Sequence, residues 1–259
     1  MNPDISIGPL LDQISWHLWP FVRIGAFVMV MPVITGSFVP QRVRLLLAVA
    51  LTIVIAPSLP AVPDAEILSM AGMILMFQEI AIGIAMGFVV QVIFDAIALG
   101  GQVIAMSMGL GFAVFVDRQR GINMPVLGQL FLMLAMLVFL SLNGHLALIQ
   151  LLADSYRILP MSAGGLDHLA TAHILQWSGQ LFVVAVAIAL PAVTALIIVN
   201  LSFGVMSRAA PTLNLFAVGF PVAMLSGFMV IFLSMENLTA NVSRSLADAF
   251  SVVQAILGS

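Results

Sequence analysis

Two long stretches of the chain carry no charged side chain, and they limit what the chain can fold into. No Asp, Glu, Lys or Arg occurs from His168 to Ser207, and none occurs from Ala209 to Met235. A membrane span needs about 20 predominantly apolar residues, because each helical residue advances the axis by about 1.5 Å. Both stretches exceed that length. The sequence therefore predicts an all-α protein of the integral membrane type.

The overall composition supports a lipid-embedded protein and excludes several kinds of chemistry. Of the 259 residues, 62% are hydrophobic and 7% are charged, whereas soluble domains have about 45–50% and about 25%. Cysteine and lysine are both absent, which excludes disulfides, thiolate metal sites, thiol catalysis and Schiff-base chemistry. The net charge of −3 gives no reason to expect binding to nucleic acid.

Apolar runs predict six helical segments in one domain covering residues 1–259. The segments are 17–37, 43–60, 66–105, 124–155, 172–206 and 211–250. The last four are longer than a simple crossing requires, so they must tilt, kink or project into a protein assembly. Proline removes a backbone N–H and crowds the preceding turn. Kinks are therefore expected at the prolines within or close to these runs, which are Pro32, Pro57, Pro191 and Pro221.

Charged residues within apolar segments are candidate functional residues. Arg23, Glu79 and Asp95 lie in such positions, where a charge is costly and usually faces a partner or a water-filled space. One interpretation is a proton or ion relay. The other, which we favour, is a buried pair that fixes helix packing. Arg23 and Glu79 are candidates for that pair.

No motif predicts an enzyme, a metal site or a cofactor. His168 and His173 are five residues apart, so they diverge around a helix, unlike the i, i+4 pair of a zinc enzyme. His145, in LNGHLALIQ, is predicted as a hydrogen-bonded histidine at a helix break. The sequence GIAMG, from Gly83 to Gly87, is a GxxxG pattern that predicts close packing against another helix.

The stretch GGQVIAMSMGLGFAVFVDRQRG, residues 100–121, combines five glycines with methionines and phenylalanines. Glycine loosens the backbone, and Met and Phe supply soft apolar bulk. Composition alone favours a helix end followed by an ordinary connection. The alternative is a deformable loop that fills a pore, since apolar constrictions close a channel by excluding water.

A second unusual stretch, SRAAPTLNLFAVGFP at residues 207–221, places polar residues and two prolines between apolar runs. Together with QEIAIGIAMGF, GGQVIAMSMGLGFA and LNGHLALIQLLADSYRILP, in the family's order, it resembles the FliR family of the flagellar type III export gate. The resemblance covers the chain from about Glu79 to Pro221. There is one departure, because the family pattern has Asp-Pro after the stretch GGQVIAMSMGLGFA, whereas here Asp117 precedes Arg118.

The resemblance implies kinked helical hairpins within a larger helical ring of FliP and FliQ subunits, completed by one FliR-family subunit with FlhB nearby. It implies a non-catalytic function as the channel entrance for unfolded flagellar proteins, in the bacterial inner membrane at the basal body. It also implies a pore plug formed by Met106, Met108, Gly109, Leu110, Gly111, Phe112 and Phe115. Residues shaping a helix break and subunit packing would be Arg208, Pro211, Asn214, Gly219 and Pro221. The alternative function is a small-molecule secondary transporter with broken helices.

Overall fold

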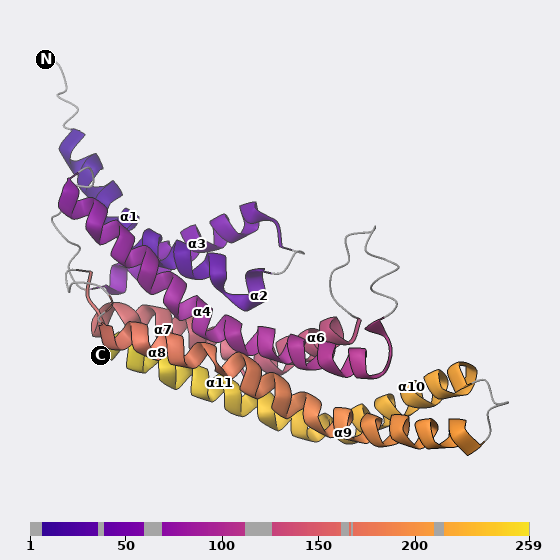
Figure 1. Ribbon diagram of the computed structural model, residues 1–259. Coiled ribbons are helices and arrows are strands. Elements are labelled where there is room, and N and C mark those ends of the chain that lie inside the picture. Colours follow the sequence, from indigo (N-terminus) through magenta and orange to yellow (C-terminus); the bar gives the residue numbers. More distant parts are fainter. Residues whose placement is uncertain are drawn as a thin grey trace, which may run out of the picture. The chain divides into compact units, whose positions relative to one another are not determined.

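The computed structural model describes residues 7–35, 39–59, 69–111, 126–161, 166, 168–209 and 215–258. In these ranges it contains helices and no strand, which confirms the all-α prediction. The elements are α1 (Ile7–Val30), α2 (Pro32–Thr35), α3 (Gln41–Ile55), the 3₁₀ turn η1 (Ala56–Ser58), α4 (Met70–Ser107), α6 (Val126–Ser141), α7 (Gly144–Ile158), α8 (His168–Ser178), α9 (Gln180–Ala209), α10 (Leu215–Leu233) and α11 (Met235–Gly258) (Figure 1).

By length and composition, three of the described helical stretches could cross a membrane, and up to five could if two bent pairs each count as one span. The three are Gln41–Ser58, Met70–Ser107 and His168–Ala209, and the pairs are α6 with α7 and α10 with α11. The six kinked segments expected from the sequence therefore stay a prediction, and the last three each contain a break.

The interruptions in the second half of the chain do not coincide with the predicted prolines. Pro191 and Pro221 lie inside continuous helices, α9 and α10. The breaks fall instead at Asn143, at Gly179 and at Ser234. Asn143 has a φ of 55°, a left-handed conformation that asparagine adopts more readily than most residues and that an α-helix cannot continue through.

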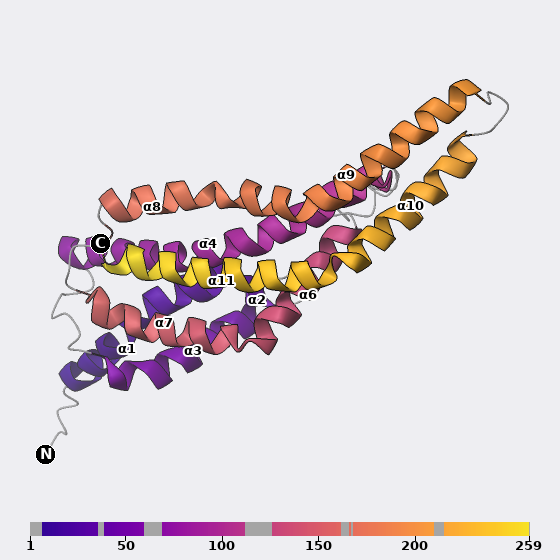
Figure 2. The ribbon, with the colours of Figure 1, turned by 90° about the horizontal axis from the view of Figure 1, so that it is seen from below.

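The contacts of the chain define two compact units. Unit 1 comprises Met1–Gln91, Asn143–Ser178 and Asp248–Ser259. Within it, α1 packs along α3, and both views show the two helices side by side (Figures 1 and 2). The indole N–H of Trp177 in α8 donates to the carbonyl oxygen of Val89 in α4 at 2.9 Å, which ties α8 to the first part of α4.

Unit 2 comprises Val92–Leu142 and Gly179–Ala247. Here α9 and α10 pack against each other as a hairpin. The second part of α4 packs on α6, where the rings of Phe94 and Phe139 meet edge to face with centroids 5.5 Å apart.

Two adjacent glycines let α4 approach both of its neighbours in unit 2. A Cβ on Gly100 would lie 3.1 Å from the carbonyl oxygen of Ala185 in α9, and one on Gly101 would lie 2.9 Å from that of Leu127 in α6. These glycines therefore belong to a packed helix. The predicted loop begins later than expected, since α4 continues to Ser107.

Candidate functional site

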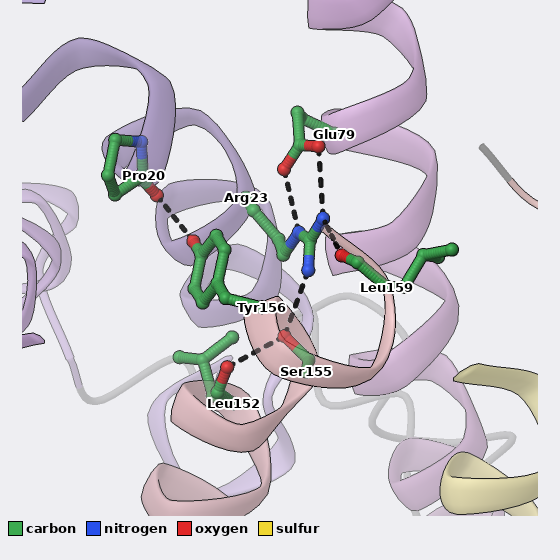
Figure 3. Close-up of polar contacts among 7 residues, drawn as sticks. All are labelled: Pro20, Arg23, Glu79, Leu152, Ser155, Tyr156 and Leu159. Carbon is green, nitrogen blue, oxygen red and sulfur yellow. Dashed lines mark hydrogen bonds and ion pairs between the residues drawn. The ribbon is translucent and has the colours of Figure 1, made fainter. Parts of the chain in front are cut away.

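The central polar group of unit 1 is Arg23, which α1 places in the interior with no exposed surface. Its Nε donates to one carboxylate oxygen of Glu79 at 2.7 Å, and its Nη2 donates to the other at 3.0 Å (Figure 3). Glu79, in α4, is only 1% exposed. This two-point geometry is the strongest way for a guanidinium to bind a carboxylate, so the structure brings together the two charges that the sequence suggested as a pair.

The third helix of this cluster, α7, satisfies the remaining side of the guanidinium. Nη1 donates to Oγ of Ser155 at 3.1 Å, and Nη2 also donates to the carbonyl oxygen of Leu159 at 3.0 Å. The ring of Tyr156 lies 4.3 Å from the guanidinium carbon, in cation–π contact. The cation is thus held by one charge, two neutral oxygens and an aromatic face.

A further set of bonds fixes these partners in turn. The hydroxyl of Tyr156 donates to the carbonyl oxygen of Pro20 in α1 at 2.9 Å, and Oγ of Ser155 donates to that of Leu152 at 2.7 Å (Figure 3). These hydrogen bonds tie α1, α4 and α7 to one another.

The GxxxG pattern lies directly beside this cluster. A Cβ on Gly83 would collide with the carbonyl oxygen of Arg23 and lie 2.9 Å from Cβ of Ala26, and one on Gly87 would lie 2.9 Å from Cβ of Val30. The two glycines let the backbones of α4 and α1 come together. The partner helix lies within this chain, and the close approach brings Glu79, one turn earlier, to Arg23.

The second feature is the end of α4 in unit 2, where the plug residues were predicted. The N–H of Leu110 donates to the carbonyl oxygen of Ala105 and the N–H of Gly109 to that of Met106, both at 3.0 Å. Gly109 has a φ of +83°. This is the Schellman ending of a helix, in which glycine takes the left-handed position at no steric cost.

The methionines on either side of this ending have different surroundings. Met108 is 1% exposed, and a Cβ on Gly227 in α10 would lie 2.6 Å from its Cγ. Met106, in the last turn of α4, is 60% exposed. Met108 is therefore packed into unit 2, whereas Met106 remains uncovered in this chain.

The rest of the predicted plug is only partly described. Leu110 and Gly111 are partly exposed at the end of the described segment, and Phe112 and Phe115 lie outside the described residues.

The residues predicted to shape a helix break lie at different places in the chain. Arg208 is exposed in the last turn of α9, where a cation is favourable for the helix dipole. Gly219 and Pro221 lie inside α10 and not at its break. Pro211 and Asn214 lie outside the described residues.

Asp95 differs from the prediction of a buried charge. It is exposed on α4, between buried neighbours on both sides. Leu99, Val103 and Met106 follow it along the helix and are all at least partly exposed. The spacing of three to four residues is that of one helical face, so Asp95 belongs to the uncovered face of α4 in unit 2.

Sequence reasoning missed the partners that complete the arginine cluster. Ser155 and Tyr156 lie within LNGHLALIQLLADSYRILP, yet nothing in their spacing indicates that they contact a cation 132 residues away in the chain. His145 lies near the start of α7 as expected, but its Nδ1 is buried without a hydrogen-bond partner. Within the described ranges, no group of three or more His, Asp or Glu residues could hold a metal ion.

Comparisons with known proteins identify the family. A model described as "Bacterial export proteins, family 1" matches residues 14–249. The chain is 38% identical over 248 residues to the flagellar biosynthetic protein FliR of Escherichia coli (strain K12), which covers 93% of this chain and 95% of that protein. It is 36% identical over 249 residues to FliR of Pectobacterium carotovorum subsp. carotovorum, with 95% of each covered. Because the family model and these relatives span nearly its whole length, the chain belongs to the FliR family of bacterial export proteins.

Proposed function

We propose that this chain is a non-catalytic subunit of the flagellar type III export gate. With FliP and FliQ homologues, and with an FlhB homologue bound nearby, it forms the channel entrance for unfolded flagellar proteins. Its place is the bacterial inner membrane at the flagellar basal body, as a single domain in a helical ring. Family membership itself makes the chain a flagellar export component with a membrane location. The partners, the substrates and the plug are the proposal.

The observation that carries the proposal is the apolar surface that the chain leaves uncovered. Phe182 and Leu201 on α9 are 67% and 68% exposed, and Leu225 and Phe232 on α10 are 70% and 76% exposed. Soluble monomers rarely expose so many large apolar side chains on neighbouring helices. Lipid and sister subunits together supply the missing cover, as expected for one subunit of a larger membrane assembly.

The end of α4 supports a plug in the segment from Met106 to Phe115. A seal must be soft and apolar, yet it needs a fixed base. Met108, packed against Gly227, and Gly109, which ends the helix, supply such a base. Met106 is uncovered beside them and supplies deformable bulk.

The experiment that tests the plug compares ion leakage through assembled complexes. Removing residues 111–115 keeps Gly109 and Leu110, whose N–H groups close the helix ending, and is expected to let ions pass through the resting channel. Met106→Ala should leak more weakly than this deletion. Its matched control is Met133→Ala, on α6, since Met133 is 63% exposed and lies outside the proposed plug. Complexes that assemble normally and stay tight after the deletion would rule out the plug.

A second experiment tests the partners. A tagged chain should co-purify with FliP, FliQ and FlhB homologues, and replacing Asn214 by Leu, at the proposed break between α9 and α10, should lower the yield of the complex on a native gel. A secondary transporter would instead bind and move its substrate alone or as a simple homo-oligomer.

A further inference from the structure

Unit 2 contains a pocket between the part of α9 that carries Pro191 and the turn that joins α10 to α11. Its volume is about 50 Å³. One side is formed by α9 at Ala187 and Pro191, and the other by the turn between α10 and α11 at Ser234 and by the first turns of α11 at Asn237 and Asn241. The lining therefore combines three polar side chains with a majority of apolar residues, among them Ile104, Phe131 and Leu238.

The polar groups of this pocket need hydrogen-bond partners. Pro191 has no N–H, so the carbonyl oxygen of Ala187, four residues earlier, lacks its usual helical donor. In the described part of the chain, the side chains of Ser234, Asn237 and Asn241 make no hydrogen bond to another residue. Asn237 is exposed and Ser234 and Asn241 are partly exposed, so water is the hydrogen-bond partner within their reach.

Water fits both the size and the chemistry of the pocket. A cavity needs roughly 10–15 Å³ and two to four polar neighbours to hold one water molecule. The pocket of about 50 Å³ exceeds that volume. The amides of Asn237 and Asn241 each offer donors and an acceptor, and the Ala187 carbonyl offers an acceptor.

The exposed faces of the helices on either side of Ser234 differ sharply. On α10, Met229 and Phe232 are 61% and 76% exposed. On α11, the exposed side chains include Glu236, Asn237 and Thr239. The two helices are bent by 57° at this break, so the change in chemistry coincides with a change in direction.

We propose that Ser234 marks the point at which the chain passes from apolar surroundings into water. The pocket beside Pro191 is filled by water that is continuous with this aqueous phase, and the exposed face of α11 does not lie in lipid. This inference concerns the surroundings of α10 and α11 and does not depend on the plug.

The chain contains no cysteine, so single cysteines report on water directly. We would introduce Asn237→Cys and Asn241→Cys and treat the assembled complex, in membranes, with a charged, membrane-impermeant methanethiosulfonate reagent. The matched control is Phe232→Cys, because Phe232 is also exposed in this chain. The two asparagine sites should react at least ~10-fold faster than the control, since the reactive thiolate forms in water and not in apolar surroundings.

Two outcomes would overturn the inference. One is equal reactivity of Asn237→Cys and Phe232→Cys. The other is an Asn237→Cys site that is blocked in the complex and reacts only after the subunits are separated, which would show that a neighbouring subunit occupies the pocket. If the asparagine variants fail to assemble, Thr239→Cys carries the same expectation, because among the described residues the Thr239 hydroxyl donates only within α11, to the carbonyl oxygen of Met235 at 3.2 Å.

Discussion

At the scale of single residues, Arg23 shows how a charge can be kept inside this chain. Burying an ion costs several kcal/mol, and the cost is recovered only with an opposite charge and further hydrogen bonds in good geometry. Glu79 supplies the opposite charge for Arg23, and Ser155 and Leu159 accept further hydrogen bonds from it. The cluster therefore stabilises one arrangement of α1, α4 and α7, because another arrangement would leave Arg23 buried without these partners.

The first prediction concerns the loss of one partner of the buried pair. Glu79→Leu should lower the free energy of unfolding by about 3–5 kcal/mol, because it leaves Arg23 buried without its counter-charge. The double variant Arg23→Met/Glu79→Leu removes both charges and should recover most of that loss. The measurement is the apparent melting temperature of the purified complex.

The control for this prediction is Arg157→Gln. Arg157 lies in the last turn of α7 and is exposed, so its replacement should change the melting temperature little. A double variant no more stable than Glu79→Leu would contradict the interpretation of Arg23 and Glu79 as a mutually dependent pair.

The second prediction isolates the hydroxyl of Tyr156. Tyr156→Phe removes the bond to the Pro20 carbonyl and keeps the ring beside Arg23. It should cost about 0.5–1.5 kcal/mol. Tyr156→Ala removes ring and bond together and should cost about 3–5 kcal/mol, as for other large aromatic side chains in cores. Equal losses in melting temperature for the two variants would show that the ring contributes nothing.

The charged members of this cluster could be predicted from the sequence, but its neutral members could not. An arginine and a glutamate in apolar runs stand out because each is costly there. A serine, a tyrosine and a backbone carbonyl are ordinary anywhere, and only the fold brings them to Arg23. Asp95 illustrates the opposite case, since its apolar neighbours in sequence do not determine which face of α4 carries it.

At the scale of elements, the approach of α1 to α4 depends on Gly83. Because the atoms that a Cβ would meet there include the backbone of α1, the helix as a whole must move to make room. Such a shift also draws Arg23 away from Glu79, so packing and charge pairing depend on each other.

The third prediction follows from this close approach. Gly83→Ala should destabilise the protein by about 1–3 kcal/mol through overpacking. Gly204→Ala is the matched control, since a Cβ on Gly204 in α9 would meet no atom of the described residues within 4 Å. There, alanine should be neutral or stabilise by up to about 1 kcal/mol, because glycine is the poorer helix former. Thermal unfolding of both variants in the assembled complex gives the comparison, and equal effects would contradict the role of Gly83.

The fourth prediction concerns the end of α4. Gly109→Ala forces a side chain into the left-handed region, at a cost of about 1–2 kcal/mol, and places a Cβ 3.2 Å from the ring of Phe220. The helix end should loosen and amide hydrogens of the last turn of α4 should exchange faster. Gly111→Ala, where the nearest atom of another residue is 3.7 Å away, should leave exchange unchanged.

Helix content could be predicted from apolar runs, and two of the expected prolines do lie at interruptions, since Pro32 begins α2 and Pro57 lies in η1. The positions of the breaks in the second half of the chain could not be predicted. Prolines were expected to kink the helices because they lack a donor, yet α9 and α10 accommodate Pro191 and Pro221 within continuous helices. The breaks occur at Asn143, Gly179 and Ser234, residues common in membrane helices. Whether such a residue ends a helix depends on packing around it, which composition does not record.

At the scale of the whole molecule, the polarity of the exposed surface differs from helix to helix. The helices α9 and α10 expose large apolar side chains, whereas α11 exposes polar ones. A monomer with this surface would be covered by detergent or would aggregate. Apolar cover from lipid and partners is therefore needed over α9 and α10, and not over the polar face of α11.

The fifth prediction tests that difference. Ile198→Arg on α9 places a cation on an apolar face that is 61% exposed at this residue in the chain alone, and burying it against lipid or a partner should cost at least about 2.5–3.5 kcal/mol. The yield of assembled complex should fall at least ~10-fold, since about 1.4 kcal/mol corresponds to a factor of ten. Thr239→Arg is the control on the exposed face of α11, where water solvates the new charge and the yield should stay within twofold of the unaltered protein. Equal losses for both variants would mean that α11 is covered as closely as α9, and equal tolerance would mean that α9 faces water.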